Sequence, residues 1–437
     1  MSSPEIVSAM RPAGVSERMP YISRALADVA TERLKRIGYF SAADYHDLHR
    51  DIKESPYHHA LLFGAWEGRQ LFKGPAIARA LVAAEYLDPA VETGLSEDDA
   101  RYLRRRGVAI YTSSRGNIFM KEIAEDLGRN IAELEIPVRL LDETAVPDKT
   151  AIAIYMAPHE FFLIGQGRRW LSDANIRDAF MYNTEQIPSS WFASAFPALL
   201  MAKGIFDISA SSAALFQNAD IPAMHWEPGL EGDVAPLSRQ DAEHPLVKVL
   251  PRSARNVSVK YRTWFERPID INFFGSNSPR RDDVLARCSA PFSRYETCIH
   301  YRHQMHGPVG RKFNERALTR VATHVARCSK ISLNIHRDEF CYFEWHRMVR
   351  QGMAMGSLVV TDHCLPHPRF KPGVHYFEED ARHIPNLVDW ILRDEDGQKT
   401  ALRLIAGSSD LIFDEEQRRN RTRMALNFIL SKIRRGG

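Results

Sequence analysis

Two short segments that are each predicted to form a strand, residues 331–335 and 357–361, constrain the fold of this chain more than any other feature. Leu358, Val359 and Val360 give the second segment the apolar character of a strand that is buried on both faces. Between them, a polar loop leads into a segment with apolar residues at helical spacing, and Gly356 stands where a helix C-cap is expected. A strand that opens into a helix in this way binds anions, because free backbone N–H groups and the helix dipole favour negative charge. The stretch predicts a parallel α/β sheet with an anion site after residue 335.

Size and composition indicate an ordinary globular protein. The 437 residues, 44% hydrophobic and 26% charged, suffice for two or three domains with separate cores. The formal net charge of +3 at pH 7 is too small to indicate a nucleic-acid partner. We therefore expect no nucleic acid among its partners.

Cysteine usage and the start of the chain indicate a cytoplasmic protein. The five cysteines include no closely spaced pair typical of a metal site. The N-terminus lacks the apolar core of a signal peptide. The longest uncharged run, residues 186–202, contains two prolines and is too short to span a bilayer. We expect no metal, no cofactor, and at most peripheral contact with the inner face of a membrane.

Changes in pattern divide the chain into six segments. Residues 1–20 are polar and contain three prolines, so we expect them to be disordered. The other segments are a helical module (21–106), a first α/β domain (107–230), a connection rich in Pro, Asp and Arg (231–268), a second α/β domain (269–412) and a C-terminal helix (413–437).

The first α/β domain begins with a buried strand, residues 108–112, followed by a polar loop and an amphipathic helix. The loop contains Arg115, Gly116 and Asn117. Strand, glycine-containing loop and helix form the first unit of a doubly wound parallel sheet. We expect further strands at residues 138–141, 151–156, 180–183, 205–208 and 223–226.

The second α/β domain begins in the same way. Strand 269–274 leads through Gly275 and Ser276 into a helix that starts near Arg280 and Arg281. Periodicity alone thus predicts two α/β domains after a small all-helical one.

The helical module carries an aromatic pattern that ends in Gly-Ala-Trp-Glu-Gly-Arg at Arg69. The pattern resembles a short module found beside bacterial glycosyltransferases. The resemblance implies association with a partner or a second copy, not chemistry. The alternative is that Tyr57, Phe63 and Trp66 are core aromatics of a small bundle.

Three groups of residues resemble the bacterial glycosyltransferases of the spore-maturation CgeB-like group. They are residues 157–162 with 182–186 and 191–192, residues 273–276 with 279–281, and residues 329–336 with 343–347 and 356–362. The resemblance implies two facing Rossmann-like doubly wound domains of the GT-B type. It also implies transfer of a sugar from a nucleotide sugar to a carbohydrate, lipid-linked or protein acceptor, in polysaccharide or glycoconjugate biosynthesis.

The resemblance places the nucleotide sugar on the second domain. Its diphosphate leaves with extra negative charge, which fixed cations and helix N-termini stabilise when no metal does. Gly275 and Ser276 would allow the diphosphate to approach the backbone closely, and Arg280 or Arg281 would bind the diphosphate. The other expected contacts are Asn334 and His336 after one strand, and Glu344 with Arg347 in the next segment. Glu344 would accept hydrogen bonds from the ribose, or else form a solvated pair with Arg347.

One position departs from a pattern of many retaining enzymes of this fold, which carry two glutamates eight residues apart. The second position is Gln351 here, and the residue eight before it is Phe343. Retention of configuration therefore cannot be inferred.

The first domain would bind the acceptor, with the loop of Arg115, Gly116 and Asn117 on that side. His159 is the sharper candidate for general base, since an imidazole titrates near neutrality. Glu160 is an alternative base or orients His159, and Glu185 is a third candidate. Simple capping of a strand end is the structural alternative for His159 and Glu160.

Two other functions fit the same framework. A nucleotide-sugar epimerase would need no acceptor, and a binding scaffold would hold nucleotide or sugar without turnover. The basic C-terminal helix either packs on the protein as a crossover helix or rests on an anionic membrane surface.

Overall fold

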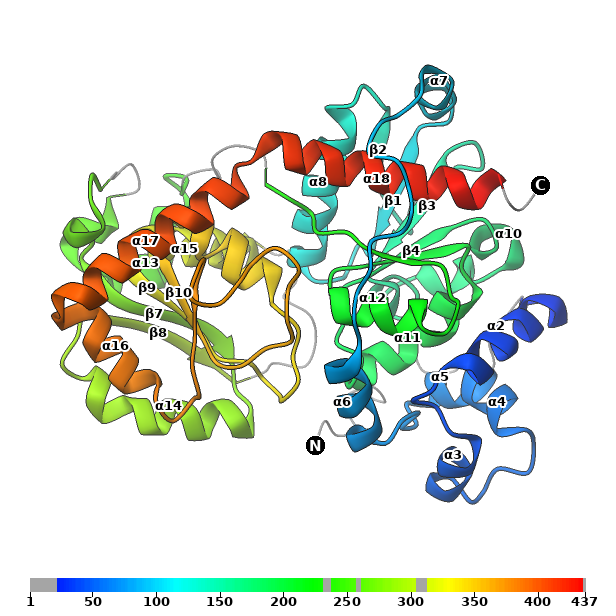
Figure 1. The fold of residues 1–437 in the computed structure, drawn as a ribbon, viewed down its shortest axis with the longest axis horizontal. Coiled ribbons are helices and arrows are strands. Elements are labelled where there is room, and N and C mark those ends of the chain that lie inside the picture. Colours follow the sequence, from blue (N-terminus) through cyan, green and yellow to red (C-terminus); the bar gives the residue numbers. More distant parts are fainter. Residues whose placement is uncertain (1–21, 231–236, 257–260, 304–312, 435–437) are drawn as a thin grey trace. The chain divides into compact units, whose positions relative to one another are not determined.

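A computed structural model describes residues 22–230, 237–256, 261–303 and 313–434 (Figure 1). The chain forms two compact units: unit 1 comprises the residues up to Gly229 together with those from Glu415, and unit 2 comprises Leu230–Asp414. The predicted disorder of residues 1–20 concerns positions outside the described residues. No helix in the described part of the chain is long and apolar enough to cross a membrane.

Unit 1 is built on a parallel sheet that confirms each strand predicted for the first domain. Its described residues form six strands in the order β2-β1-β3-β4-β5-β6. The strands are β1 (Val108–Thr112), β2 (Val138–Asp142), β3 (Ile152–Met156), β4 (Phe180–Asn183), β5 (Gly204–Asp207) and β6 (Ala223–His225). Strands β1, β4, β5 and β6 are buried along their whole length, which is why each reads as a continuous apolar run.

Helices of unit 1 connect these strands and form the module that precedes them. The connecting helices are α8 (Ile118–Ala132), α9 (Pro158–Phe161), η2 (Gly167–Trp170), α10 (Asp173–Ile176), α11 (Ser190–Met201) and α12 (Ala210–Gln217). The module consists of α2 (Arg24–Arg36), α3 (Ala42–Leu48), α4 (Pro56–His59), η1 (Ala60–Gly64), α5 (Ala65–Glu67), α6 (Gly74–Ala83) and α7 (Glu97–Arg106).

The helical module packs on α11 and belongs to unit 1. Arg33 Nη1 donates to the carbonyl oxygens of Leu200, at 2.8 Å, and Ala202, at 2.7 Å, and so caps the end of α11. Trp66 is buried, as a core aromatic would be. Partner binding through the module stays a prediction.

The C-terminal helix α18 (Glu415–Arg434) crosses back from unit 2 and packs on unit 1. Its apolar face is buried, and the ring of Phe428 contacts the rings of Phe180 and Phe206. Its basic side chains pair within the unit: Arg418 with Glu133 and Arg421 with Asp88, both at 2.6 Å. The helix therefore packs as the predicted crossover helix, and its contact with a membrane surface stays a prediction.

Unit 2 is built on a second parallel sheet, which confirms the predicted pair of Rossmann-like domains. Its described residues form five strands in the order β11-β10-β9-β7-β8. The strands are β7 (Ile269–Ser276), β8 (Thr297–Arg302), β9 (Ser329–Asn334), β10 (Leu358–Thr361) and β11 (Phe377–Glu378), and the longer helices are α14 (Pro279–Phe292), α15 (Phe313–Arg327), α16 (Ile384–Arg393) and α17 (Glu395–Ile412). Apolar residues of β7, β9 and β10 form its core with α14, α16 and α17.

The predicted connection, residues 231–268, is part of unit 2 in its described stretches. It contains the short helices η3 (Asp241–Glu243), α13 (Pro245–Val249), η4 (Arg252–Arg255) and η5 (Trp264–Glu266). Leu237, Val247 and Leu250 are buried in a core cluster with Ile269 of β7. Polar composition predicted a linker, whereas a few well-spaced apolar residues fix this segment to the domain that follows.

The helix predicted between β9 and β10 is not a regular α-helix. It consists of a π turn, η6 (His346–Arg350), and a 3₁₀ turn, η7 (Met353–Met355). Gly352 lies between them, and a Cβ there would come within 2.6 Å of Val359 and 2.8 Å of the Met348 carbonyl oxygen. This close packing against β10 bends the segment. Gly356 ends it in the left-handed conformation at φ 69°, as predicted.

Candidate functional site

The predicted site residues gather at one point in each sheet. In unit 2, the chain passes from β7 to β8 on one side and later to β9 on the other; in unit 1 it passes from β1 to β2 and then to β3. Loops that leave the carboxyl ends of such strands diverge, and in open α/β sheets ligands bind in the crevice between them. The candidate sites are therefore the ends of β7 and β9 in unit 2 and the ends of β1 and β3 in unit 1.

The connection from β7 to α14 in unit 2 is fixed by side chains of the predicted set. Ser278 caps α14, its Oγ accepting from Arg281 N at 3.2 Å. Arg281 is 1% exposed, and it donates from Nε to the carbonyl of Ile335 and from Nη1 to that of Ser276. Burial lowers the pKa of Arg281 to about 10, so the side chain is charged at neutral pH. Arg281 thus joins the end of β7 to the loop after β9.

Gly275 has a packing role in the structure, and its contact with the diphosphate stays a prediction. It lies inside β7, and a Cβ there would meet the Phe273 ring at 2.6 Å. The packing of Phe273 therefore requires a glycine whether or not a ligand approaches. Ser276 is the last residue of the strand, and its carbonyl accepts from Arg281.

A buried chain of three charged or polar side chains closes the end of β9. His336 and Asp362 are both 0% exposed, and His336 Nδ1 lies 2.5 Å from Asp362 Oδ1. The second carboxylate oxygen of Asp362 pairs with Arg280 Nη1, which also donates to the His336 carbonyl at 3.1 Å. Burial acts to raise the pKa of Asp362, but the bond from His336 and the charge of Arg280 hold it below its usual value.

Asn334, the last residue of β9, presents an unused acceptor. Its Nδ2 donates to Thr361 Oγ1 at 3.2 Å and lies 3.4 Å from His336 Nε2. Among the described residues, its buried Oδ1 has no hydrogen-bond partner. A buried carbonyl oxygen without a donor is costly, so a ligand hydroxyl or N–H is a fitting partner.

Glu344 is a second unused acceptor. Its Oε2 is buried without a hydrogen-bond partner in the described structure, and it lies 3.5 Å from Arg347 Nε. Burial acts to raise the pKa of Glu344, but the charges of Arg347, His336 and Arg281 hold it below its usual value. Arg347 in turn donates to the Phe274 carbonyl at 2.9 Å. The pair is partly buried, unlike the solvated pair considered as the alternative.

In unit 1, the loop after β1 is occupied by carboxylates. Glu143, after β2, accepts from Ser114 N at 2.7 Å, and Glu160 Oε2 accepts from Asn117 N at 2.8 Å. Gly116 lies so close to Glu160 that a Cβ would come within 2.4 Å of Oε2. Backbone N–H groups that elsewhere cradle a phosphate are here satisfied by the protein's own carboxylates. Glu160 therefore holds the loop, whereas Arg115 is exposed beside it.

His159 and Glu185 form a pair at the ends of β3 and β4. His159 Nε2 lies 3.6 Å from Glu185 Oε2, and the Trp191 ring contacts the imidazole. Nδ1 of His159 is buried and has no hydrogen-bond partner among the described residues. Burial lowers the pKa of His159 to about 3, which corrects the expectation that it titrates near neutrality. The imidazole is neutral at physiological pH.

The backbone before His159 is strained. Ala157 has φ 49° and ψ 66°, a left-handed conformation that is uncommon for a residue with a Cβ. This turn ends β3 and starts α9 at once, which brings His159 to the edge of the sheet. Such strain is often kept where a side chain must be placed for function.

A buried carboxyl group lies at the end of β5 in the same sheet. Asp207, at the end of β5, is 0% exposed; it accepts from Asn183 Nδ2 at 2.9 Å and from Ser209 N at 2.8 Å. Burial raises the pKa of Asp207 to about 8, so the group carries a proton at neutral pH. Asn183 in turn donates to the Glu185 carbonyl at 2.9 Å and thereby fixes the loop after β4.

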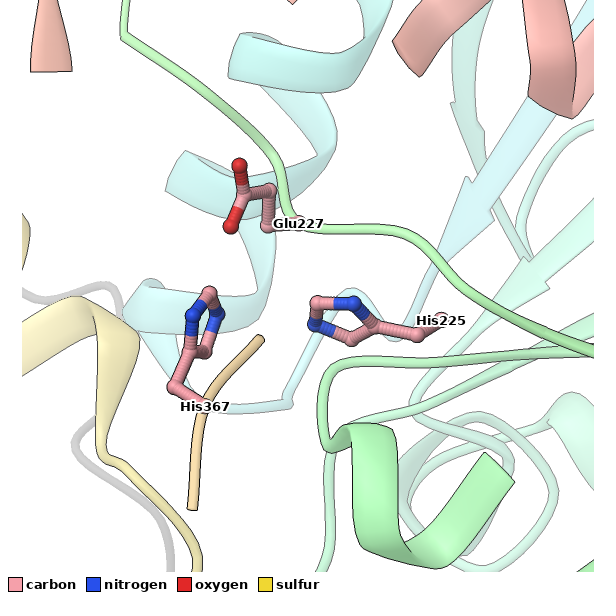
Figure 2. A group of neighbouring side chains, drawn as sticks. All are labelled: His225, Glu227 and His367. Carbon is pink, nitrogen blue, oxygen red and sulfur yellow. The ribbon is translucent and has the colours of Figure 1, made fainter. Parts of the chain in front are cut away.

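Two residues of types that bind metal ions lie at the end of β6 in unit 1. His225 ends that strand and Glu227 lies just beyond it, and both are buried (Figure 2). Arg421 donates to the His225 carbonyl at 2.6 Å, and His225 N donates to Tyr86 Oη at 3.0 Å. In unit 2, His367 is buried in the loop after β10, where its ring packs on Phe343. Independence from metal stays a prediction.

Sequence reasoning missed Asp362, Glu143 and Asp207. Each is an acidic residue at or just after the end of an apolar strand, and that position is the signal that marks a residue at the carboxyl edge. Asp362 stood at the boundary of a predicted strand, but its partner lies 26 residues earlier in the chain.

The two units are Rossmann-like α/β domains, each built on a doubly wound parallel sheet. No family model matches the sequence, and no curated protein matches it. Among solved structures, the chain is similar to HepE of Anabaena in complex with UDP-glucose, with 12% identity over 72% of this chain and 98% of that one, and a TM-score of 0.43. It is also similar to a DNA-modifying β-glucosyltransferase, with 12% identity, coverage of 74% and 99%, and a TM-score of 0.42. Similarity to an α1,3-fucosyltransferase has 9% identity, coverage of 79% and 92%, and a TM-score of 0.38. Membership of the CgeB-like group stays a prediction.

Proposed function

We propose that the protein is a glycosyltransferase in which unit 2 binds a nucleotide-sugar donor and unit 1 supplies the acceptor side. The observation that carries the proposal is the contrast between the two switch points. In unit 2, cationic side chains surround unused acceptor atoms at the ends of β7 and β9. In unit 1, the equivalent loop is filled by Glu143 and Glu160. The ends of β7 and β9 in unit 2 favour an anion, whereas the carboxylates in the loop after β1 of unit 1 disfavour one.

The cations of unit 2 suit the diphosphate of the donor. When the bond between the sugar carbon and the diphosphate breaks, the leaving oxygen gains negative charge. Arg280 and Arg347 carry fixed positive charge beside His336, and α14 directs its N-terminus to the same edge of the sheet. A metal is not required for this charge balance, and we propose that the reaction proceeds without one.

The unused acceptors of unit 2 suit hydroxyl groups. Glu344 Oε2 and Asn334 Oδ1 are buried acceptor atoms that need a donor. Ribose and sugar hydroxyls are such donors. The Glu344 carboxylate is the stronger acceptor, and we assign it to the ribose.

In unit 1, the pair of His159 and Glu185 suits the acceptor hydroxyl. With Nε2–H directed at Glu185, the lone pair of Nδ1 receives the hydroxyl proton as the acceptor oxygen attacks the sugar carbon. With a pKa of about 3, His159 is a weak base in the free protein, so the proton transfer depends on Glu185, which stabilises the imidazolium that forms. The acceptor group is a hydroxyl of a carbohydrate, a lipid-linked compound or a protein. The carboxylates of unit 1 disfavour an anionic group beside that hydroxyl.

Turnover of nucleotide sugars tests the proposal. A panel of nucleotide sugars is incubated with candidate acceptors, and released nucleoside diphosphate is measured. His159→Ala should lower transfer at least about 100-fold, the usual contribution of a general base, with nucleoside diphosphate affinity unchanged. The exposed His383→Ala serves as the matched control and keeps full activity.

Other outcomes of this experiment would identify the alternatives. Isomerised donor in the absence of acceptor would identify an epimerase. Nucleoside diphosphate binding without release from any donor would identify a scaffold. Full transfer by His159→Ala would refute the assigned base.

A further inference from the structure

Trp191 differs from the other tryptophans of unit 1 because its side chain is partly exposed. The three others are at most 4% exposed, and they are Trp66, Trp170 and Trp226. Trp191 is the second residue of α11, whose start is fixed by Ser189: its Oγ accepts from Phe192 N at 3.0 Å. Phe192 itself is 0% exposed. The packing of Phe192 thus anchors the helix start, and Trp191 is held in place without being buried in the core.

The indole of Trp191 lies against the imidazole of His159. The ring centroids are 6.0 Å apart, and the ring planes meet at 69°. Glu185 Oε2 lies 3.6 Å from Nε2 of the same imidazole, and Nδ1 has no hydrogen-bond partner among the described residues. The Glu185 side chain is 25% exposed. An aromatic ring, a carboxylate and an imidazole nitrogen with an unused lone pair therefore meet at one place on unit 1.

These three groups match the two kinds of surface that a saccharide ring presents. The faces of the sugar ring carry C–H groups, which pack on aromatic side chains. Its rim carries hydroxyl groups, which donate to carboxylates and to a neutral imidazole nitrogen. The hydroxyl of a serine or threonine in a protein acceptor supplies a donor but no apolar ring face. The arrangement therefore favours a saccharide over a protein hydroxyl.

We propose that Trp191 is the aromatic platform of the acceptor site, and that the acceptor hydroxyl belongs to a saccharide ring stacked on its indole. The inference rests on the proposed function, because it takes His159 as the base that faces the acceptor. It narrows the acceptor to one chemical class, a saccharide that is either free or joined to a lipid. Trp191 is then a residue that determines acceptor specificity.

Binding measurements without any donor test the inference first. The full chain is applied to a broad array of immobilised glycans, and the best saccharide is then studied by ligand-observed NMR in free form and joined to a lipid. A peptide rich in serine and threonine is the comparison. We expect saturation transfer to the C–H protons of one sugar ring and none to the peptide. Equal affinity of the free and lipid-linked forms would assign recognition to the sugar alone, and tighter binding of the lipid-linked form would add the lipid to the ligand.

Two variants separate stacking from simple shielding of the imidazole. Trp191→Leu keeps an apolar side chain beside His159 but removes the aromatic face, so Kd for the saccharide should rise about tenfold. Trp191→Phe restores an aromatic face and should stay within about threefold of wild type. Trp390→Ala changes a tryptophan on α16 of unit 2 that is 37% exposed, and it should bind as wild type. Thermal melting verifies that each variant is folded.

Kinetics with a nucleotide sugar and the same saccharide give a second readout. Trp191→Leu should raise KM for the saccharide about tenfold and leave kcat and the KM of the donor within about twofold of wild type. A lower kcat with an unchanged saccharide KM would show that Trp191 only shields His159, and would overturn the inference.

The outcomes separate this inference from the proposed function. Saccharide binding that depends on Trp191, without binding or turnover of any nucleotide sugar, would refute the proposed function and leave the saccharide site in place. Sugar transfer to peptides alone, or no binding to any glycan of the array, would overturn the saccharide platform. Saccharide affinity unchanged in Trp191→Leu would overturn it as well.

Discussion

The substitution Glu344→Gln tests whether Glu344 accepts a hydrogen bond from the ribose or acts only through its negative charge. Glutamine keeps the shape of the side chain but replaces one carboxylate oxygen by an amide group. In the structure, Glu344 Oε2 is buried, lacks a hydrogen-bond partner among the described residues, and lies 3.5 Å from Arg347 Nε. A ribose hydroxyl that donates to this carboxylate would supply the missing bond.

The expected loss follows from the charge of the acceptor. A hydrogen bond to a charged group contributes about 1.5–3 kcal/mol, which corresponds to about 10–150-fold in Kd. Glutamine can still accept through its remaining oxygen, so the lower end applies. We expect Glu344→Gln to weaken binding of a ribonucleoside diphosphate by about tenfold.

Calorimetry with ribose and deoxyribose forms of one nucleoside diphosphate checks this. The wild type should bind the 2′- or the 3′-deoxy form more than about tenfold more weakly than the ribose form, and this discrimination should be smaller, though not abolished, in Glu344→Gln. Glu339→Gln, an exposed glutamate in the same loop, is the matched control and should behave as wild type. A Glu344→Gln variant that weakens the ribose and both deoxy forms by the same factor would refute the ribose contact.

Three further predictions follow from buried groups and from the charge balance. Between about pH 4 and 8 the folded chain holds a proton on Asp207 that the unfolded chain releases, so the free energy of unfolding should fall by up to about 1.4 kcal/mol per pH unit as pH rises. Urea unfolding should show this slope in the wild type and its loss in Asp207→Asn. An unchanged slope in Asp207→Asn would contradict the assignment of the proton to Asp207. Gly64→Ala places a Cβ 1.9 Å from Tyr45 Oη and should destabilise unit 1 by about 1–3 kcal/mol in the same assay, whereas Gly74→Ala, with no atom within 4 Å of the new Cβ, should not. Because arginine and histidine side chains supply the positive charge, EDTA should leave sugar transfer unchanged; activity that is lost with EDTA and restored by Mg²⁺ would show that a metal takes part.

Most strands could be predicted because burial on both faces favours apolar residues, whereas β8 and β11, which have no fully buried residue, were not predicted. The strand predicted at residues 108–112 has those bounds in the structure, and the strand predicted at 357–361 begins one residue later, at Leu358. The positions of Asn334 and His159 near the carboxyl ends of strands could be predicted for the same reason, and their roles stay predictions. A position at the carboxyl edge of a parallel sheet follows from local sequence alone.

Contacts between distant segments could not be predicted in this way. The pairing of His336 with Asp362 depends on the register of β9 and β10, and the approach of Glu160 to Gly116 depends on the neighbouring strands β1 and β3. The depressed pKa of His159 depends on burial that no local pattern reveals. Close packing at Gly352 likewise replaced a predicted helix by two short turns.

The central claim is that the carboxyl end of the unit 2 sheet, and not that of unit 1, binds the diphosphate of a nucleotide. Hydrogen–deuterium exchange of the full chain with and without millimolar nucleoside diphosphates tests it directly. We predict slower exchange in the peptides that contain residues 276–281 and 334–347, with no change at residues 113–117. Protection at residues 113–117, or no protection with any nucleoside diphosphate, would contradict the claim.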